Sequence, residues 1–399
     1  MEIKDKNDLI AQITKEINQQ DQEVIQWRRY LHQHPELSFQ ETETALFIVN
    51  KMEEFGFDIQ TNIGGNGIIA TLTGGKPGKS IAFRADFDAL PIQDEKDVPY
   101  RSQHPGIMHA CGHDGHTAAL LGFAKVLIKY QAEMNGNVVF IFQPAEETPP
   151  GGAKAMLQAN DEFQKIDYAF AAHLASDLPV GQLALGSGYR MAAVDKFAIT
   201  IKGRGGHGAR PQDANDPIVI GSDMVNALQK IVSRRIDPLA SAVVTIGVFQ
   251  SGNAFNVIPD SAKLEGTVRS FNQEIRNQVE ENIRAIVNGI ATAYDANVEI
   301  EYLRGYPALY NDPQVTKQVE KQFTEGFDQH NVVEFEPMMG AEDFSYFLEA
   351  IPGTYFRVGS QNESPSTSYP HHHPLFDMDE RALKNIQLAF LAIASAYVF

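Results

Sequence analysis

Short apolar runs of strand length alternate with helical segments through the first half of the chain, and this alternation constrains the fold more than any other feature. The helical patterns lie at 117–130 and 153–159, and the apolar runs lie at 67–72, 80–85, 137–142 and 167–173. Strands that alternate with helices are typical of an α/β layer with parallel or mixed pairing. The run at 137–142 is apolar without interruption, which suits a strand that is buried on both faces.

The pattern changes near residue 190. From there the expected order is strand, helix, two strands, helix and strand, at 195–202, 216–235, 241–250, 260–270, 272–294 and 297–303. That order, β-α-β-β-α-β, is the split pattern of a ferredoxin-like domain. Beyond about residue 306 the chain returns to helices and short strands. We therefore predict an α/β fold in two domains: an α/β domain made of 1–188 and 304–399, and an inserted ferredoxin-like α+β domain made of 189–303.

Composition and charge exclude several classes of protein. With 43% apolar residues and a formal net charge of −18, we expect a folded protein that does not bind nucleic acid, because such binding needs basic surface. The most apolar stretch, 386–399, has about 14 residues and is too short to span a bilayer. The polar first seven residues lack the apolar core of a signal peptide. We therefore expect a cytoplasmic protein with no membrane partner.

The densest group of potential metal ligands lies at 109–116, directly before the helix expected at 117–130. It holds three histidines, an aspartate and the chain's single cysteine, Cys111. Thiolate, imidazole and carboxylate groups bind borderline-soft divalent metals. Any one of these histidines could instead cap the helix or pack, but their concentration favours a metal site.

A pair of glutamates, Glu146 and Glu147, follows the buried strand expected at 137–142. Open α/β sheets gather their sites at the carboxyl ends of strands. Neighbouring side chains on an extended backbone point in opposite directions, so one carboxylate can bind metal while the other faces a bound water as a general base. The alternative for such a pair is a solvated acidic loop.

Further histidines extend the candidate set. His173 ends the apolar run at 167–173, where a structural role is the alternative, and 371–373 is a run of three histidines in a polar loop. One catalytic zinc takes three or four protein ligands, so this larger number of ligand-type side chains points to two ions. Two-metal sites suit hydrolysis. The sequence has no Gly-x-Ser-x-Gly elbow, no Walker A loop and no Gly-x-Gly-x-x-Gly motif that opens a helix; the glycine-rich segment 203–208 follows an expected strand of the inserted domain instead.

Eight motifs follow one another along nearly the whole chain. They lie at 28–38, 83–91 (with Arg84-Ala-Asp86), 108–118 (with Cys111-Gly-His113), 143–147 (Gln-Pro-Ala-Glu-Glu), 205–207 (Gly-Gly-His), 256–259 (Asn-Val-Ile-Pro), 266–269 (Gly-Thr-Val-Arg) and 339–344. Through them the sequence resembles the M20 metallopeptidases, specifically the amidohydrolase branch that includes hippurate hydrolase and the plant auxin-conjugate hydrolases. The resemblance implies a zinc-peptidase-like catalytic domain and a homodimer formed through the inserted domain, which serves as a lid.

The resemblance also implies two divalent ions per subunit, Mn²⁺ or Zn²⁺, with Co²⁺ or Ni²⁺ as alternatives. In this family the last ligand stands two residues before a proline, which selects His372 over His371 and His373. The implied ligand set is Cys111, His113, Glu147, His173 and His372.

Catalytic and substrate-binding roles follow from the same resemblance. Glu146 would be the base that deprotonates the attacking water and then protonates the leaving amine, and Asp86 would orient the site. His207 would reach the partner subunit's site and polarise the scissile carbonyl. Asn256 and Arg269 are candidates for holding a substrate carboxylate, although Arg269 could instead pair with an acidic neighbour inside the lid.

The function expected from these residues is metal-dependent hydrolysis of the amide bond in N-acyl amino acids. A dipeptidase or carboxypeptidase with the same dinuclear site is one alternative. A non-catalytic metal-binding protein is another, and the presence of both Glu146 and Glu147 disfavours it.

Overall fold

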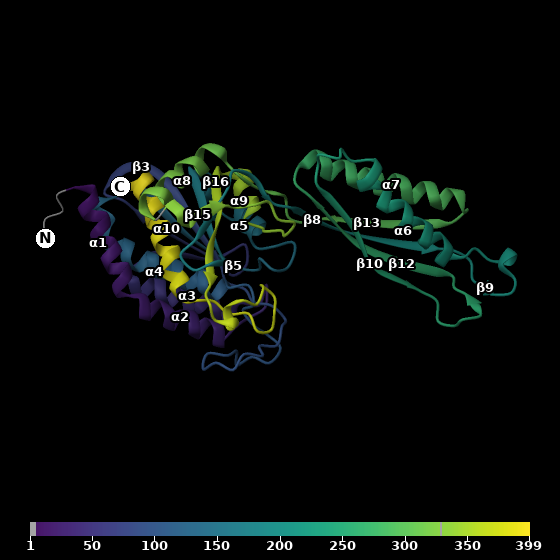
Figure 1. Cartoon of the computed structure of the whole chain (residues 1–399), viewed down its shortest axis with the longest axis horizontal. Coiled ribbons are helices and arrows are strands. Elements are labelled where there is room, and N and C mark those ends of the chain that lie inside the picture. The colour runs from purple at the N-terminus through teal and green to yellow at the C-terminus, as the bar shows by residue number, and fades with distance from the viewer. Residues whose placement is uncertain (1–4, 328) are drawn as a thin grey trace. The chain divides into compact units, whose positions relative to one another are not determined.

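The computed structural model describes residues 5–327 and 329–399, so part of the polar N-terminal segment, residues 1–4, lies outside the described residues. The chain forms two compact units (Figure 1). The first unit comprises Met1–Gly188, Tyr310–Glu336 and Asp343–Phe399, and the second comprises Tyr189–Leu309 and Pro337–Glu342.

The first unit is built on a mixed sheet that has eight strands within the described residues, in the order β1-β2-β4-β3-β5-β16-β6-β15. The central strands β4, β3, β5 and β16 run parallel to one another, so their carboxyl ends meet at one edge of the sheet. The strands are β1 (Ile59–Ile63), β2 (Gly67–Thr73), β3 (Lys76–Asp86), β4 (Asn135–Gln143), β5 (Tyr168–Pro179), β6 (Leu183–Leu185), β15 (Val332–Glu334) and β16 (Gly353–Gln361).

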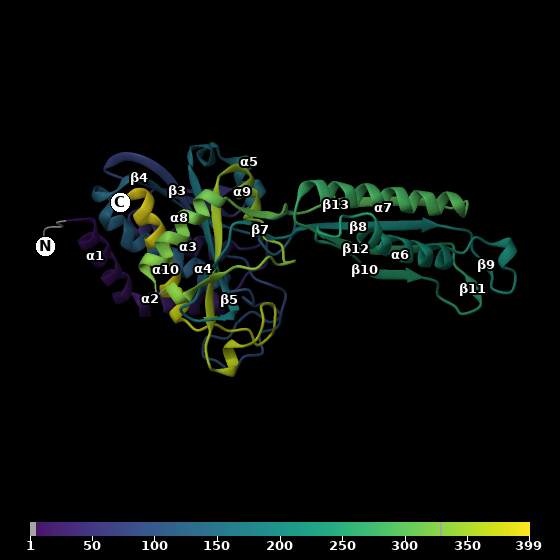
Figure 2. The same cartoon turned by 45° about the horizontal axis from the view of Figure 1, so that its top comes forward.

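Helices α4 (His113–Leu127) and α10 (Arg381–Val398) pack on β3, and α2 (Asp21–Gln33) packs on α4 (Figure 2). In α4 every residue except Lys125 is buried, because the helix has neighbours on all sides. The remaining helices of this unit are α1 (Lys6–Gln19), α3 (Thr42–Phe55), α5 (Ala153–Ala159), α8 (Pro313–Gly326) and α9 (Ser345–Ala350). Short 3₁₀ helices lie at Ile128–Glu133, Asp161–Lys165, Gln329–Asn331 and Pro365–Thr367.

An aromatic cluster holds α4 and α10 against the sheet. The ring of Phe83 on β3 is fully buried and lies 5.3 Å from Phe123 and 4.7 Å from Phe390, measured between ring centroids. Burial of such side chains supplies most of the driving force for folding. Because α4 is fixed along its length, its amino-terminal residues are held at the carboxyl edge of the parallel strands.

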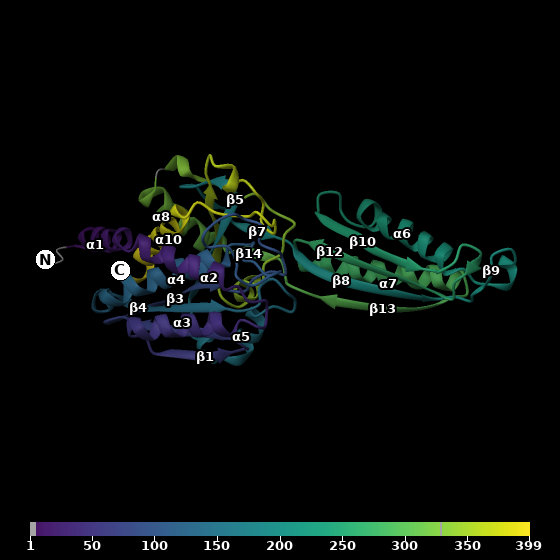
Figure 3. The same cartoon turned by 90° about the horizontal axis from the view of Figure 1, so that it is seen from below.

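The second unit is an antiparallel sheet in the order β10-β12-β8-β13, with helices α6 and α7 lying side by side along it (Figure 3). Its elements are β8 (Ala193–Lys202), α6 (Pro217–Arg234), β10 (Ala242–Ser251), β12 (Ser261–Ser270), α7 (Gln273–Ala293) and β13 (Asn297–Arg304). This is the expected β-α-β-β-α-β order of a ferredoxin-like domain. The predicted fold class, an α/β domain with an inserted α+β domain, is therefore confirmed.

Short elements complete the second unit and the segments that enter and leave it. β9 (Gly206–His207) pairs with β11 (Val257–Ile258) in a two-stranded ribbon. A 3₁₀ helix covers Pro211–Asp213, and β7 (Gly188–Met191) and β14 (Leu309–Asn311) lie where the chain passes between the units.

The second unit also takes in residues 304–309 and 337–342, beyond the inserted domain of 189–303. Backbone hydrogen bonds explain this. The Gly305 amide donates to Val194 O at 2.9 Å, and the Ala192 amide donates to Met338 O at 3.2 Å and to Gly340 O at 2.9 Å. Both segments are thus attached to the start of β8.

None of the helices within residues 5–327 and 329–399 combines the length and the apolar content that crossing a membrane requires.

We predict that Leu127→Ala, at the buried end of α4, lowers the free energy of unfolding of the first unit by about 2–5 kcal/mol, because it leaves a cavity in the core. Leu46→Ala serves as the matched control, since Leu46 lies on α3 in the same unit and is half exposed. Its effect should stay below about 1 kcal/mol. Urea denaturation followed by circular dichroism measures both. Equal losses in the two variants would contradict the packing described for α4.

Candidate active site

The candidate residues of the first unit gather at the carboxyl edge of the parallel strands. Glu146 and Glu147 follow β4, His173 lies on β5, and Cys111 and His113 flank the start of α4. Gly112 begins that helix with a φ of +94°, a left-handed conformation that side chains other than glycine rarely adopt. A Cβ at this position would also lie 3.1 Å from the Leu174 side chain. Glycine therefore lets the chain turn sharply between the two ligand-type residues.

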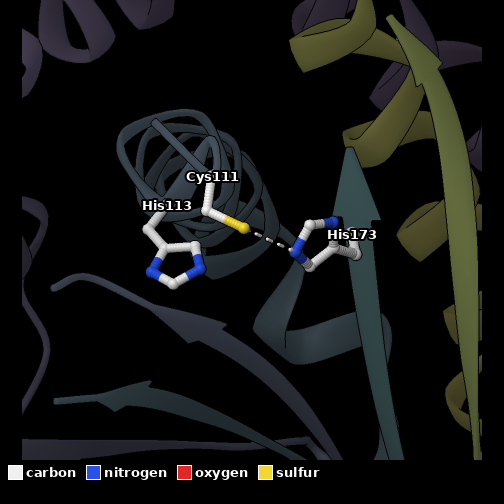
Figure 4. Close-up of side chains that lie close together, drawn as sticks. All are labelled: Cys111, His113 and His173. Atoms are coloured by element: carbon white, nitrogen blue, oxygen red, sulfur yellow. Dashed lines mark hydrogen bonds between the residues drawn. The ribbon is translucent and has the colours of Figure 1, made fainter. Parts of the chain in front are cut away.

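Of the five groups of side chains among the described residues that could each hold a cation, three overlap at the predicted ligands, and within each group the ligand atoms lie within 4.8 Å of one another. The three groups are Cys111–His113–His173, Cys111–Glu147–His372 and His113–Glu146–Glu147. Figure 4 shows the first, in which Cys111 Sγ and His173 Nε2 are 3.5 Å apart. The structure thus brings all five residues of the sequence-predicted ligand set into one cluster.

Hydrogen bonds determine which nitrogen of two of these histidines faces the cluster. His113 Nδ1 lies 3.0 Å from Asp88 O, and His173 Nδ1 lies 2.6 Å from Leu174 O. A carbonyl oxygen can only accept, so in each ring Nδ1 carries a proton and donates it. Nε2 is thereby directed at the cluster, which is the arrangement of a metal-binding histidine with an oriented ring.

Two buried atoms in the cluster have no hydrogen-bond partner among the described residues: His113 Nε2 and Glu147 Oε1. Their separation is 3.8 Å. Buried polar atoms are almost always hydrogen-bonded, so this unsatisfied pair requires an explanation. A cation between the two atoms would satisfy both, and the thiol, imidazole and carboxylate donors fit a divalent metal such as zinc.

The electrostatics of the cluster also favour a cation. Burial, reinforced by the carboxylates of Glu147, Glu146 and Asp86, raises the pKa of the Cys111 thiol well above its usual value. Burial alone would lower the pKa of His113, but neighbouring carboxylates, with Asp86 the strongest, outweigh it and raise this pKa to about 10. The excess negative charge thus favours the protonated forms of Cys111 and His113, and a bound cation would take the place of those protons.

The three consecutive histidines near the C-terminus have different surroundings. His372 has a positive φ of 66°, and its Nε2 lies 3.4 Å from Glu147 Oε1. The ring of His371 lies 4.8 Å from that of Phe376, measured between ring centroids, and its Nε2 accepts the Ser176 amide at 3.4 Å. His373 stacks on Tyr369 and accepts the Leu375 amide. Of the three, His372 is the one whose ring nitrogen approaches the cluster.

Glu146 is buried, and its Oε2 lies 3.9 Å from His113 Nε2. The residue before it, Ala145, has a left-handed φ of 55°, which is uncommon for a residue other than glycine. The buried carboxylate of Glu41 accepts the Ala145 amide at 2.9 Å and the Phe39 amide at 2.8 Å. These bonds hold the backbone of the turn that leads from β4 to Glu146.

Asp88 is a site residue that the sequence did not single out. It is buried, its Oδ1 lies 3.2 Å from His113 Nδ1, and its Oδ2 accepts the Glu147 amide and the Ser38 hydroxyl. Asp86, expected to orient the site, contacts His116 Nδ1 at 2.6 Å and is bound by Arg84 at 2.7 Å. Asp88 stands two residues after Asp86 in the same motif. This Asp-x-Asp spacing is the sequence signal that could have identified Asp88 as a site residue.

The other predicted residues belong to the second unit. His207 on β9 is exposed, and the Gly208 amide next to it donates to Asn256 O at 2.9 Å, so these two predicted residues are neighbours. Arg269, near the end of β12, is half-buried and donates to the Thr267 hydroxyl at 3.0 Å. Asp195, an acidic residue of the same unit, forms its ion pair with Arg276 rather than with Arg269.

The model of peptidase family M20/M25/M40 matches residues 82–395. The chain belongs to this family. Among its relatives, the YhaA protein of Bacillus subtilis (strain 168) is 47% identical to this chain, and the match covers 97% of this chain and 99% of YhaA. The N-acyl-L-amino acid amidohydrolase of Geobacillus stearothermophilus is 43% identical over 75% of this chain and 81% of its own. Thermostable carboxypeptidase 1 of Saccharolobus solfataricus is 39% identical over 97% and 98%.

A solved structure of an M20 protein has the same fold. The Bacillus subtilis YXEP protein, described as a dinuclear metal-binding peptidase from the M20 family, superimposes with a TM-score of 0.81. It is 38% identical, and the match covers 94% of this chain and 98% of that one. The protein is therefore an M20 hydrolase of the dinuclear metal-binding type, as predicted, whereas the role of each individual residue stays a prediction.

We predict that His372→Ala lowers the metal content of the purified protein by about one ion per chain, because one ligand of a cation site is lost. His373→Ala is the matched control, since its ring stacks on Tyr369 and accepts a local amide. That variant should keep the wild-type content. Elemental analysis after dialysis measures both, and a loss confined to His373→Ala would contradict the assignment.

Proposed function

We propose that this protein hydrolyses the amide bond of N-acyl amino acids, such as N-acetyl or N-benzoyl derivatives, releasing a carboxylic acid and a free amino acid. The observation that carries the proposal is the placement of two adjacent carboxylates, Glu146 and Glu147, on one side of the cluster. One can serve as a ligand while the other serves as a base. The similarity to an N-acyl-L-amino acid amidohydrolase supports the choice of substrate class.

The chain's residues would divide the work between holding metal and moving a proton. Cys111, His113, Glu147, His173 and His372 would hold two divalent ions, Mn²⁺ or Zn²⁺. When bound, such ions polarise a carbonyl and lower the pKa of water. Glu146 would accept a proton from the attacking water and pass it to the leaving amine. Its burial keeps competing solvent away from that proton.

The second unit would supply a lid and a homodimer contact. Fully exposed Phe255 and half-exposed Val257 lie beside His207 and Asn256, and exposed apolar groups of this kind are common at contact surfaces. His207 follows the end of β8, whereas Arg269 pairs with Val194 at its start. Eight residues of strand separate the two ends by roughly 27 Å. One carboxylate could therefore be held by both Asn256 and Arg269 only if they come from different chains.

The test is release of free amine from a panel of N-acetyl, N-benzoyl and longer N-acyl amino acids, together with plain dipeptides. Metal-stripped protein reloaded with Mn²⁺ or Zn²⁺ should cleave the acylated amino acids. Cleavage confined to dipeptides would favour the second candidate, a peptidase. The 39% identity to a carboxypeptidase over nearly the full length is the observation that keeps this candidate open. No cleavage of any compound would overturn both.

We predict that Glu146→Ala keeps two ions per chain and loses turnover by several orders of magnitude, because the ligand cluster remains while the proton acceptor is gone. Glu133→Ala, at an exposed position of the same unit, is the control and should turn over at the wild-type rate. The measurement pairs elemental analysis with initial rates on the best substrate of the panel. Substantial activity in Glu146→Ala would refute its role as the base.

We further predict that His207→Ala subunits and Glu146→Ala subunits, each inactive alone, regain activity when mixed and reassembled. If His207 acts on the partner's site, one of the two sites in each mixed dimer is intact, so random reassembly should give about one quarter of wild-type activity. Size-exclusion chromatography confirms the dimer beforehand. Absence of complementation in verified mixed dimers would mean that His207 acts within its own chain.

A further inference from the structure

His116 belongs to another group, Asp86–His113–His116, which is fully buried and whose ligand atoms are close enough to hold a cation. Both of its ring nitrogens, however, are already bound by the protein. Nδ1 lies 2.6 Å from Asp86 Oδ1, and Nε2 lies 2.9 Å from the backbone nitrogen of Leu174. The side chain is 2% exposed, so water does not replace these partners.

The Leu174 contact determines the proton positions on the His116 ring. A backbone amide can only donate, so Nε2 of His116 must accept, and the ring proton must lie on Nδ1, where it is donated to Asp86. A metal on Nε2 would leave the Leu174 amide buried without an acceptor, which is destabilising. The geometry therefore argues against His116 as a ligand.

His116 binds the backbone of Leu174, the residue that directly follows His173. The Leu174 amide donates to His116, and the Leu174 carbonyl accepts from His173 Nδ1 at 2.6 Å. The His173 ring is left with Nε2 directed at Cys111 Sγ, 3.5 Å away. Its orientation thus depends on where Leu174 is held.

We propose that His116 is a positioning residue for His173: by accepting the Leu174 amide, it fixes the backbone that orients the His173 ring toward the metal cluster. Asp86 holds the His116 ring in the required tautomer. Arg84, bound to Asp343 at 2.9 Å, anchors Asp86 in turn. This inference rests on the metal centre of the proposed function.

Two conservative variants separate the two bonds of His116. In His116→Gln the side-chain oxygen can occupy the place of Nε2 and accept the Leu174 amide, but the bond to Asp86 is lost. In His116→Asn the side-chain nitrogen can occupy the place of Nδ1 and donate to Asp86, but the bond to Leu174 is lost. The pair therefore tests which bond matters, and His116→Ala removes both.

The experiment titrates metal-stripped full-length protein with Co²⁺ and with Zn²⁺, and measures the number of ions bound and the dissociation constant of each. Co²⁺ also reports on thiolate and imidazole ligands through its absorption spectrum. Melting temperatures of the metal-free proteins are measured first, to establish that each variant is folded. His104→Gln, at an exposed histidine of the same unit, is the control.

We expect His116→Asn to bind one of the two ions about 10- to 100-fold more weakly than wild type. Loss of residues that orient metal ligands typically weakens metal binding by this factor. His116→Gln should bind both ions within about threefold of wild type, with an unchanged Co²⁺ spectrum. Wild-type affinity in His116→Asn would overturn the proposal. Weakening in His116→Gln equal to that in His116→Asn would also overturn it, because the ring itself would then be required.

Because the readout is metal binding, failure of this inference is distinguishable from failure of the proposed function. A wild-type protein that binds two ions but cleaves no compound of the substrate panel would refute the proposed hydrolysis and leave the His116 result intact. Wild-type hydrolysis with equal metal affinity in all His116 variants would refute the positioning role alone.

Discussion

The concentration of negative charge at the carboxyl edge of the parallel strands is the constraint on which the rest of the site depends. Asp86, Asp88, Glu146 and Glu147 meet there in a largely buried setting, with His113 in contact with all four. Burying carboxylates is costly unless they are paired with cations or hydrogen-bond donors. Arg84 balances part of this charge, and the unsatisfied atoms of His113 and Glu147 mark where divalent cations would balance more.

A second buried arginine stabilises the start of α4, next to the metal-ligand cluster. Arg28 on α2 is fully buried and binds Asp114 at 2.9 Å, Asp377 at 3.0 Å and Glu380 at 3.3 Å. Asp114 follows His113 directly, so this ion cluster connects α2, the start of α4 and the segment before α10. Breaking a buried ion pair by removing one partner is strongly destabilising. The ligand-bearing turn is therefore held by charges on one side and by the aromatic core along α4.

Much of this architecture could be predicted from local patterns. The runs at 137–142 and 167–173 became β4 and β5, and the β-α-β-β-α-β order became the second unit, because periodicity and length reflect which faces are buried. The spacing of Asp88 from Asp86 was a local signal, but the contact of Asp88 with His113 was not predictable from it, and Glu41 had no such signal. Glu41 acts through the Ala145 amide, which is 104 residues away in the sequence. Contacts over such separations leave no local periodic signal.

By itself the sequence determined the fold class, the family and the kinds of side chain available, since these follow from apolar periodicity and from motifs at fixed spacing. Only the tertiary structure decided how those side chains are used. Four neighbouring histidines in the cluster are chemically identical, yet His113, His173 and His372 direct a nitrogen at the ligand atoms while His116 is bound by a backbone amide. The reason is that folding gives each ring different hydrogen-bond partners, and these select the nitrogen that carries the proton. Asp88 binds the His113 ring and the Leu174 carbonyl binds the His173 ring, whereas Asp86 on β3 and the Leu174 amide on β5 bind both nitrogens of His116.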